Sequence, residues 1–462
     1  MSGRAQDRAP QSNPARWVAY DVLRAVGESD AYANLLLPRE LAKAQLSPAD
    51  AGLATELTYG TLRRQGTYDA VIAEAARRPV DEIDPAVLDA LRIGVHQLLA
   101  TRVPAHAAVN ETVRQVRQAA GKPASGFANA VLRRVSERTT EQWQARLDEL
   151  ARSDDERLGL RHAHPVWVIR ALRRALAAEG RADELDDLLA ADNASPSVTM
   201  TALPGLAERP ADAEPTRLSP IGFRLGGGDP ARIIAATEGR VRVQDEGSQL
   251  AALALTRAEP VRAGERWLDL CAAPGGKTAV LAAEALAHGA VLEANELSPS
   301  RARLVRDSVA GVPLDVPVSE EDGRERAGRG RYDRILVDAP CTGLGALRRR
   351  PEARWRKQPA DVPALSELQR ELLSAAVDAL APGGIVAYVT CSPHLAETAA
   401  VVAEVLREHG DAVEELDARA VLAGLSDAPI DLPAQLDGSG RAQLWPHRHN
   451  TDAMSISLLR RR

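Results

Sequence analysis

Two of the three cysteines directly follow predicted strands, where a thiol can serve as a nucleophile. Cys341 lies in the sequence DAPCTG after a strand predicted for residues 332–340, and Cys391 lies in TCSP at the end of a strand predicted for residues 383–391. The carboxyl ends of parallel strands meet at one edge of a sheet, and ligands bind beyond that edge. We therefore expect the two thiols to lie near one ligand. The alternative is that each is a small buried hydrophobic residue, which is the usual role of a free cysteine.

A pair of thiols beside a nucleotide pocket suits methylation of cytosine at C5. This carbon is a poor nucleophile, but addition of a thiolate at C6 makes it enamine-like, so that it can attack an electrophilic methyl group. The thiolate needs a lowered pKa or an adjacent base, and an acid near N3 must offset the charge that develops on the ring. Asp338 stands three residues before Cys341, so its carboxyl group could contact N3 and the exocyclic amine.

A glycine-containing loop between a predicted strand and a predicted helix could hold a cofactor. Gly275 and Gly276 allow a tight turn and close approach of a ligand, and the following helix N-terminus offers free N–H groups. A phosphate-binding P-loop would require glycine where Cys271 stands, and the dinucleotide fingerprint GxGxxG is absent. An ordinary strand–turn–helix junction is the other alternative. The candidate loop consists of Cys271, Ala272, Ala273, Pro274, Gly275, Gly276 and Lys277.

Two acidic residues further along could complete a nucleotide pocket. Glu296 ends the second predicted strand of this region, where a carboxylate can bind the hydroxyl groups of a ribose. Asp322 follows a weak third strand and could accept a hydrogen bond from an adenine amino group. Each residue could instead be a solvated surface charge.

The elements that must position these residues fall into distinct regions. Apolar residues recur with helical spacing across residues 15–150, where proline and glycine separate about seven helices. Residues 151–260 mix helices with short strands and predict a connecting α/β subdomain. Strands and helices alternate across residues 261–462, which predicts a mostly parallel sheet with helices on both faces. Residues 1–14 are expected to be a flexible tail.

Composition excludes several classes of protein. Hydrophobic residues make up 45% of the 462 residues and the net charge is −6, values typical of a soluble globular protein. No apolar stretch reaches the ~18–20 residues of a membrane helix, and the polar N-terminus lacks the apolar segment of a secretory signal. Three cysteines without a CxxC pair cannot form a disulfide framework. We therefore expect a cytoplasmic protein that does not bind a membrane.

Taken together, the motifs resemble those of the Sun-type (Fmu) RNA cytosine-C5 methyltransferases. The resemblance rests on DLCAAPGGKT, on DAPCTG followed by RRRPEARW, and on TCS in the catalytic part. It also includes ANAVLRR, HPVW and VQDEGSQL before that part, and it covers roughly residues 15–460. The order of elements is similar to that of bacterial enzymes that modify small-subunit ribosomal RNA. This resemblance implies an all-α NusB-like RNA-binding domain followed by a Rossmann-like, S-adenosylmethionine-dependent methyltransferase domain.

The resemblance also assigns a role to each residue of the cofactor site. Residues 271–277 would form the S-adenosylmethionine loop. Glu296 would bind the ribose and Asp322 the adenine side, while Asp338 would lie beside both the cofactor and the target base.

The two cysteines receive different roles. By resemblance, Cys391 matches the nucleophile of the family, and Cys341 matches a second cysteine that helps to release the product. DNA cytosine-C5 enzymes instead use a cysteine that follows proline after the fourth strand, and that precedent would favour Cys341. We follow the RNA enzymes, because both cysteines are present in the matching motifs.

The resulting interpretation is an RNA cytosine-C5 methyltransferase that acts as a monomer on 16S ribosomal RNA or a small-subunit assembly intermediate, and not on DNA. A transfer RNA target, a non-catalytic NusB-like RNA-binding accessory protein and a P-loop NTPase are the alternatives. The arginine-rich residues 348–357 are expected to bind RNA, since arginine suits phosphate contacts. No metal site is expected. His447, His449 and Asp452 form one short cluster, for which a contact with RNA or at an interface is favoured over a metal ion.

Overall fold

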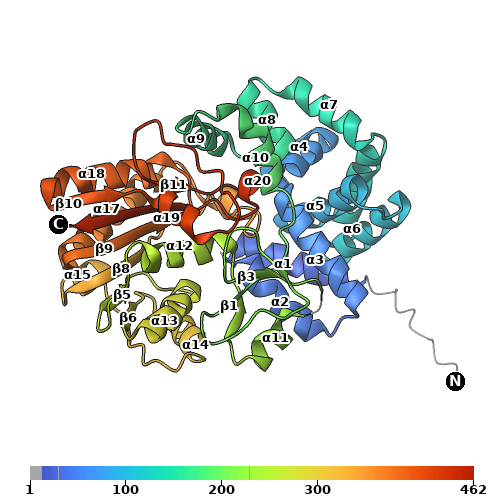
Figure 1. Cartoon of the computed structure of the whole chain (residues 1–462). Helices are drawn as coiled ribbons and strands as arrows, with labels where there is room; N and C mark the ends of the chain where they lie inside the picture. Colours follow the sequence, from blue (N-terminus) through green and yellow to red (C-terminus); the bar gives the residue numbers. More distant parts are fainter. Residues whose placement is uncertain (1–12, 30, 228) are drawn as a thin grey trace. The chain divides into compact units, whose positions relative to one another are not determined.

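Two units make up the chain in the computed structural model, which describes residues 13–29, 31–227 and 229–462 (Figure 1). The first unit runs to Arg170 and includes Arg348–Arg356, and the second consists of Ala171–Leu347 and Lys357–Arg462. The first unit thus extends beyond residue 150, where we expected the helical domain to end. Most of the tail expected at residues 1–14 lies outside the described residues, and at its end Asn13 caps the first helix.

The first unit is helical, and five of its described helices begin at residues whose side chains satisfy free N–H groups of the first turn. The side chains of Asn13, Ser47, Asp84, Thr139 and Ser153 accept hydrogen bonds from backbone N–H groups, which is the action of an N-cap. Its main helices are α1 (Pro14–Glu28), α2 (Ala33–Ala44), α3 (Pro48–Arg63), α4 (Gln65–Ala76), α5 (Pro85–Ala100), α6 (Ala105–Ser136), α7 (Thr140–Leu150) and α8 (Asp154–His162).

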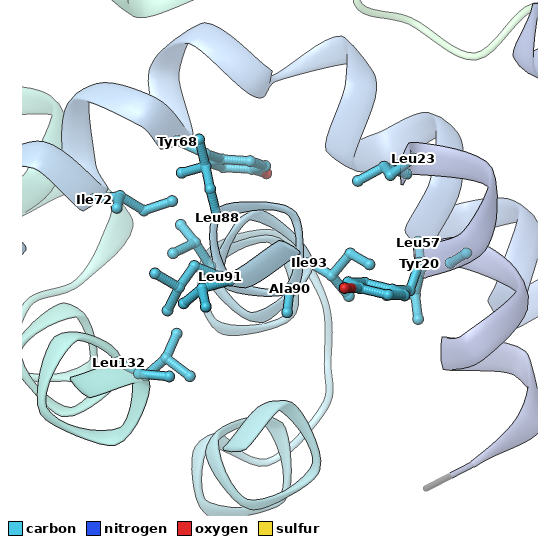
Figure 2. Close-up of a cluster of buried hydrophobic side chains, with 14 of the residues drawn as sticks. Tyr20, Leu23, Leu57, Tyr68, Ile72, Leu88, Ala90, Leu91, Ile93 and Leu132 are labelled. Carbon is cyan, nitrogen blue, oxygen red and sulfur yellow. The ribbon is translucent and has the colours of Figure 1, made fainter. Parts of the chain in front are cut away.

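The core of the first unit surrounds α5. Buried side chains from α1, α3, α4 and α6 are directed at Leu88, Leu91 and Ile93 of this helix (Figure 2). Helix α6 is interrupted at Gly121, whose φ of 87° lies in the left-handed region. The helical path is therefore broken at a glycine, in agreement with the expectation that proline and glycine separate the helices of this region.

The segment Arg348–Arg356 belongs to the first unit, and part of it is buried. Arg354 is 0% exposed and donates to the carbonyl oxygens of Arg63, His162 and Ala163 at 3.3, 3.4 and 3.1 Å. These groups lie at the ends of α3 and α8, where helix carbonyls lack partners and carry partial negative charge. The RNA-binding prediction was wrong for Arg354, because this arginine satisfies helix ends inside the protein; for the rest of residues 348–357 it stays a prediction.

Further contacts hold this segment in place. Glu352 is 2% exposed and accepts a hydrogen bond from the backbone N–H of Ala33 at 3.3 Å. Arg356 donates to the carbonyl oxygen of Val26 at 3.0 Å. The ring of Trp355 fills the space beside Gly66, where an added Cβ atom would come within 2.3 Å of it. The helical unit is therefore completed by residues that follow Cys341 closely in sequence.

The second unit contains a small antiparallel sheet with the strand order β2-β3-β1-β4. Its core includes Met200, Phe223 and Val241. Gln249 donates from its side-chain amide to the carbonyl oxygens of Met200 and Gln244 at 3.2 and 3.0 Å, which attaches the sheet to the helix that follows. The strands are β1 (Thr199–Ala202), β2 (Glu214–Pro215), β3 (Gly222–Arg224) and β4 (Val241–Val243).

The larger sheet has the order β10-β12-β9-β8-β5-β6-β7. Strands β5 to β9 pair in parallel, and β12 is antiparallel to both β9 and β10, so the predicted mostly parallel sheet is confirmed. The short β11 pairs with β12. The strands are β5 (Arg266–Asp269), β6 (Val291–Asn295), β7 (Val318–Ser319), β8 (Tyr332–Asp338), β9 (Leu380–Thr390), β10 (Val413–Leu416), β11 (Ala442–Gln443) and β12 (Ser455–Arg461).

Helices cover both faces of this sheet. The adjacent residues Leu336 and Val337 of β8 belong to two separate hydrophobic cores, because successive side chains of a strand point to opposite faces. One core contains α12 (Glu246–Arg257), α13 (Gly276–His288) and α19 (Ala418–Leu425), and the other contains α17 (Asp361–Ala379) and α18 (Ala399–His409). The remaining α-helices are α9 (Val166–Ala177), α10 (Leu185–Asp192), α11 (Pro230–Ala236), α14 (Pro299–Val309), α15 (Gly323–Ala327), α16 (Ala353–Arg356) and α20 (Pro446–His449).

The strand order reverses direction at β5. The chain passes from β5 to β6 on one side of it and later returns to β8 on the other side. Open α/β sheets bind ligands outside the carboxyl ends of the strands at such a switch point. The candidate residues all follow the carboxyl ends of β5 to β9.

Replacing Arg354 with alanine should lower the free energy of unfolding by about 1–3 kcal/mol, because buried carbonyl groups lose their donor. Urea denaturation followed by circular dichroism measures this difference. The control is Arg39→Ala, which removes an exposed arginine of the same unit and should change stability by less than about 0.5 kcal/mol. Equal stability of the two variants would contradict the anchoring role of Arg354.

Candidate active site

The loop between β5 and α13 makes a turn that requires glycine. Gly275 has a φ of 99°, and a Cβ atom there would lie 2.5 Å from Cβ of Ser308 and 3.0 Å from Cα of Val305. Its N–H donates to the carbonyl oxygen of Ala272 at 2.8 Å. Because α13 begins at Gly276, the free N–H groups of its first turn lie at the switch point, where they favour an anionic group.

Asp269 anchors this loop from the end of β5. It is 0% exposed, and its Oδ2 accepts a hydrogen bond from Thr278 Oγ1 at 2.7 Å. Burial is the largest influence on this carboxyl group and raises its pKa to about 7. Cys271 lies in the same loop, and burial likewise raises the pKa of its thiol. Cys271 is therefore a neutral part of the loop at neutral pH.

Asn295, the last residue of β6, ties three strand ends together. Its side-chain amide donates to the carbonyl oxygens of Leu270 and Glu321 at 3.2 and 3.0 Å. Its Oδ1 accepts hydrogen bonds from Ser319 Oγ at 2.8 Å and from the N–H of Glu321 at 3.2 Å. The loops that follow β5, β6 and β7 are thus held in one arrangement.

Glu296 follows Asn295 directly and is 5% exposed. Its Oε1 accepts a hydrogen bond from the N–H of Ser298 at 3.1 Å, and its Oε2 lies 3.6 Å from Nη2 of Arg301. The carboxylate is therefore oriented by its own turn and paired with a cation.

Asp322 caps the short helix α15 and binds an arginine. Its carboxylate accepts hydrogen bonds from Nε and Nη2 of Arg324 at 2.9 and 2.6 Å, and these bonds are the main reason that its pKa is lowered. An adenine amino group at Asp322 would have to share this carboxylate with Arg324.

Lys277 and Asp338 form an ion pair across the switch point. Nζ of Lys277 lies 2.7 Å from Oδ2 of Asp338, and the two side chains are 10% and 23% exposed. Burial alone lowers the pKa of Lys277, but Asp338 and then Cys391 outweigh it, so the net shift is upward. The lysine is therefore a fixed positive charge within electrostatic reach of a cysteine sulfur.

The structure brings Cys341 and Cys391 together, as their positions after neighbouring strands predicted. Their sulfur atoms are 3.5 Å apart and both residues are half-buried. The loop after Cys341 returns to the other cysteine, since the N–H of Gly345 donates to the carbonyl oxygen of Cys391 at 2.8 Å. The hydrogen bond with Cys391 is the largest influence on Cys341, and with burial it raises the pKa of Cys341 well above its ordinary value.

Gln244 supplies a polar group that the sequence analysis missed. It is 6% exposed, and within the described part of the chain its Nε2 and Oε1 atoms have no hydrogen-bond partner. A Cβ atom on Gly276 would lie 3.6 Å from that Nε2 atom. A buried amide without a partner is costly, so a polar ligand at the start of α13 would satisfy it.

The histidines near the C-terminus bind protein groups. Nε2 of His447 lies 2.8 Å from Oε2 of Glu184, and His449 accepts from the N–H of Trp445 at 2.8 Å and lies 2.9 Å from the carbonyl oxygen of Asp431. These contacts differ from the expected contact with RNA or at an interface. Among the described residues, no cluster of three or more potential metal ligands occurs. None of the described helices combines the length and apolar character needed to cross a membrane.

Comparison with known proteins identifies the family. Residues 257–460 match the family described as 16S rRNA methyltransferase RsmB/F, and residues 13–137 match the NusB family. Ribosomal RNA small subunit methyltransferase B of Pseudomonas putida is 36% identical over 404 residues, which are 84% of this chain and 88% of that protein. The chain belongs to the RsmB/F methyltransferase family.

Other similar proteins agree with this result. A Mycobacterium tuberculosis protein named as a methyltransferase, Rv1407, is 49% identical over 459 residues and covers 97% of both chains. The crystal structure of PH0851 shares the fold with a TM-score of 0.77 at 23% identity, covering 97% of this chain and 99% of the other. A methyltransferase homologue from Pyrococcus horikoshii has a TM-score of 0.54 at 22% identity and covers 66% and 98% of the two chains.

Membership in the RsmB/F family makes the chain an S-adenosylmethionine-dependent methyltransferase. The site fits this cofactor by its chemistry. The first turn of α13 and the unpaired amide of Gln244 suit the amino-acid end of the molecule, and the carboxylate of Glu296 suits ribose hydroxyl groups. The cofactor supplies an electrophilic methyl group.

Sequence reasoning named candidate reactive residues for this RsmB/F site, whose roles stay predictions, but it did not name the residues that hold the loops of the site. Asn295 is an amide at the end of a buried strand, and this signal was available in the sequence. Gln244 lies in the quoted segment VQDEGSQL, but its unpaired amide is visible only in three dimensions. Gln369 is one of several polar residues of helix α17, and Thr342 lies in the loop after β8, so that no local pattern singles out either residue.

Gly275→Ala should weaken S-adenosylmethionine binding and also lower stability, because the new Cβ atom meets Ser308 and the backbone of Val305 at a positive φ. Isothermal calorimetry and thermal unfolding measure the two effects. Gly424→Ala, in α19, is the matched control, since nothing lies within 4 Å of the added atom. Unchanged cofactor affinity in Gly275→Ala would exclude a tight fit at this turn.

Proposed function

We propose that this RsmB/F protein methylates C5 of a cytosine in 16S ribosomal RNA through a covalent cysteine adduct. The observation that carries the proposal is the pair of sulfur atoms of Cys341 and Cys391, 3.5 Å apart, at the carboxyl ends of β8 and β9. Lys277 and Asp338 form their ion pair at the same edge. One target base beyond this edge could meet a nucleophile, a polar pair and the methyl donor together.

Cys391 is the proposed nucleophile. The contact with Cys391 raises the pKa of Cys341, and in the proposal Cys341 donates its S–H to the sulfur atom of Cys391 and stabilises a thiolate there. The ammonium group of Lys277 interacts electrostatically with the same sulfur. A cationic group lowers the free energy of a nearby thiolate. Both influences favour Cys391 over Cys341 as the attacking group.

The proposed reaction has four steps. The Cys391 thiolate forms a bond to C6 of cytosine while Asp338 contacts N3 and the exocyclic amine. C5 then takes the methyl group from the sulfonium sulfur of the cofactor, and S-adenosylhomocysteine is the leaving group. A base removes the C5 proton, and the electron pair released at C5 expels the Cys391 thiolate from C6. Cys341 assists this last stage and thereby frees the methylated RNA.

The residues proposed to contact the cofactor lie at or just after the carboxyl ends of β5, β6, β7 and β8. Residues 271–277 would surround the methionine part, and Glu296 would accept hydrogen bonds from the ribose hydroxyls. Asp322 would contact the adenine side, in competition with Arg324. Asp338 would lie between the cofactor and the base.

An RNA substrate is supported by the first unit and by the relatives. Residues 13–137 match the NusB family, and the relative from Pseudomonas putida is named as a ribosomal RNA small subunit methyltransferase. We propose that the helical unit binds 16S ribosomal RNA or a small-subunit assembly intermediate, that the protein acts as a monomer, and that it does so in the cytoplasm. Neither DNA nor a membrane is part of the proposal.

The target is tested by bisulfite sequencing of total RNA from a strain that lacks the gene. One cytosine of 16S ribosomal RNA should lose its methylation and regain it when the gene is restored. If cytosine methylation is lost only in transfer RNA, transfer RNA is the substrate and 16S ribosomal RNA is not. No change at any cytosine would contradict cytosine-C5 methylation.

Glu296→Ala should weaken S-adenosylmethionine binding about 5- to 150-fold, because ribose hydroxyl groups that lose their partner cost about 1–3 kcal/mol. Calorimetry with the cofactor measures this effect directly. Glu404→Ala removes an exposed glutamate on α18 and should leave the affinity unchanged. Equal affinity in both variants would exclude Glu296 as a ribose ligand.

Substitution of the two cysteines should block different steps of the reaction. Cys391→Ala should abolish methyl transfer, because no adduct forms and C5 stays unreactive. Cys341→Ala should still form the adduct but release RNA slowly, so that a protein–RNA species persists on a denaturing gel. If that species appears with Cys391→Ala and not with Cys341→Ala, the two roles are reversed.

A further inference from the structure

A buried carboxylate links the two cysteine loops without touching either sulfur. Glu397 is 0% exposed and lies in the short 3-10 helix before α18. Its Oε1 accepts hydrogen bonds from the N–H of Thr342 at 2.7 Å and from the side-chain amide of Gln369 at 3.2 Å. Its Oε2 accepts from Thr342 Oγ1 at 2.5 Å and from Ser392 Oγ at 2.6 Å. Four donors thus converge on one carboxylate.

The donors are the immediate neighbours of the cysteines. Thr342 follows Cys341, and Ser392 follows Cys391. Their hydroxyl oxygens also lie 3.0 Å from each other. Gln369 of α17 donates in addition to the carbonyl oxygen of Pro340 at 2.8 Å, the residue before Cys341. The cluster therefore holds the backbone on both sides of Cys341 and on one side of Cys391.

We propose that Glu397 is a positioning residue that sets the separation of the two catalytic sulfur atoms. The inference rests on the proposed function in so far as both thiols take part in one reaction. It extends that function to a residue that contacts neither cofactor nor base. The carboxylate fixes the loop after β8 against the loop after β9, so that Cys341 can share its proton with Cys391.

The chemistry of the cluster requires a carboxylate or a close substitute. A buried carboxylate is stable only when its oxygens accept several hydrogen bonds, and here each oxygen accepts two. Alanine would leave the N–H of Thr342 and one of the two hydroxyl groups without an acceptor, since the other hydroxyl can donate across the 3.0 Å between Thr342 Oγ1 and Ser392 Oγ. Glutamine could keep its oxygen on Thr342 and Gln369 and donate its amide to the two hydroxyl oxygens, which can rotate to accept.

The first test compares kinetics of the full-length protein. Glu397→Ala should lower kcat for methyl transfer about 10²-fold, as expected when reacting groups are misplaced by about 1 Å. The KM for RNA and the affinity for S-adenosylmethionine should stay unchanged, because Glu397 contacts neither ligand site. Glu397→Gln should restore most of kcat. The matched control is Glu284→Gln, which alters another buried glutamate, 1% exposed and paired with Arg257 on the opposite side of the sheet.

The second test measures how fast the two thiols form a disulfide in the absence of RNA, a rate that depends on the distance between the sulfur atoms. Diamide removes two electrons and two protons from a pair of thiols, joins them in a disulfide and is itself reduced to the hydrazine. Sulfur atoms held 3.5 Å apart need to move little to reach the ~2.0 Å of a disulfide. Mass spectrometry should find the Cys341–Cys391 disulfide forming rapidly in the unaltered protein and in Glu397→Gln, and at least about tenfold more slowly in Glu397→Ala.

The two tests separate the possible failures. If the unaltered protein does not methylate cytosine, the proposed function fails, while the oxidation rates still decide the role of Glu397. If Glu397→Ala does not fold, Ser392→Ala removes a single donor and should give a smaller loss of kcat with the same unchanged KM. Unaltered kcat and oxidation rate in a folded Glu397→Ala protein would overturn the proposal, as would an equal loss in Glu284→Gln.

Discussion

Strands β8 and β9 run in parallel with Asp338 beside Val389, and the reactive edge of the sheet depends on this register. Because of this register, β8 and β9 end beside each other, and Cys341 and Cys391, which follow these strands, lie next to each other. A slip of one residue would turn each side chain to the other face of the sheet. The register is held by the two hydrophobic cores, to which alternate residues of β8 and β9 contribute.

Charge at this edge is organised in pairs because little water is available to solvate it. Lys277 balances Asp338, and burial raises the pKa of Asp269 to about 7, so that this carboxyl group is partly protonated at neutral pH. Glu397 is instead stabilised by four hydrogen-bond donors. In the proposed reaction Cys341 keeps its proton, and the nearby ammonium group of Lys277 favours negative charge on Cys391. The reactivity of one thiol thus follows from the placement of its neighbours.

The sequence predicted much of this arrangement for clear reasons. Strand–helix alternation identified the parallel sheet, and the positions of Cys341 and Cys391 after its strands predicted their proximity. Local patterns did not reveal long-range contacts. The arginine-rich residues 348–357 were predicted to bind RNA, yet Arg354 is buried against the ends of α3 and α8, because only the folded chain brings those carbonyl groups together. The same limit explains why Gln244 and Gln369 were missed.

The central claim is that Cys391 is the residue that attacks the base. An RNA that carries 5-fluorocytidine at the target position tests it directly, because fluorine at C5 cannot leave as a proton and the adduct is trapped after methyl transfer. Protease digestion and mass spectrometry of the trapped complex of the unaltered protein identify the attached residue. We predict that the nucleotide is found on the peptide that contains Cys391. Attachment to Cys341, or to no cysteine in a complex that has transferred its methyl group, would contradict the account.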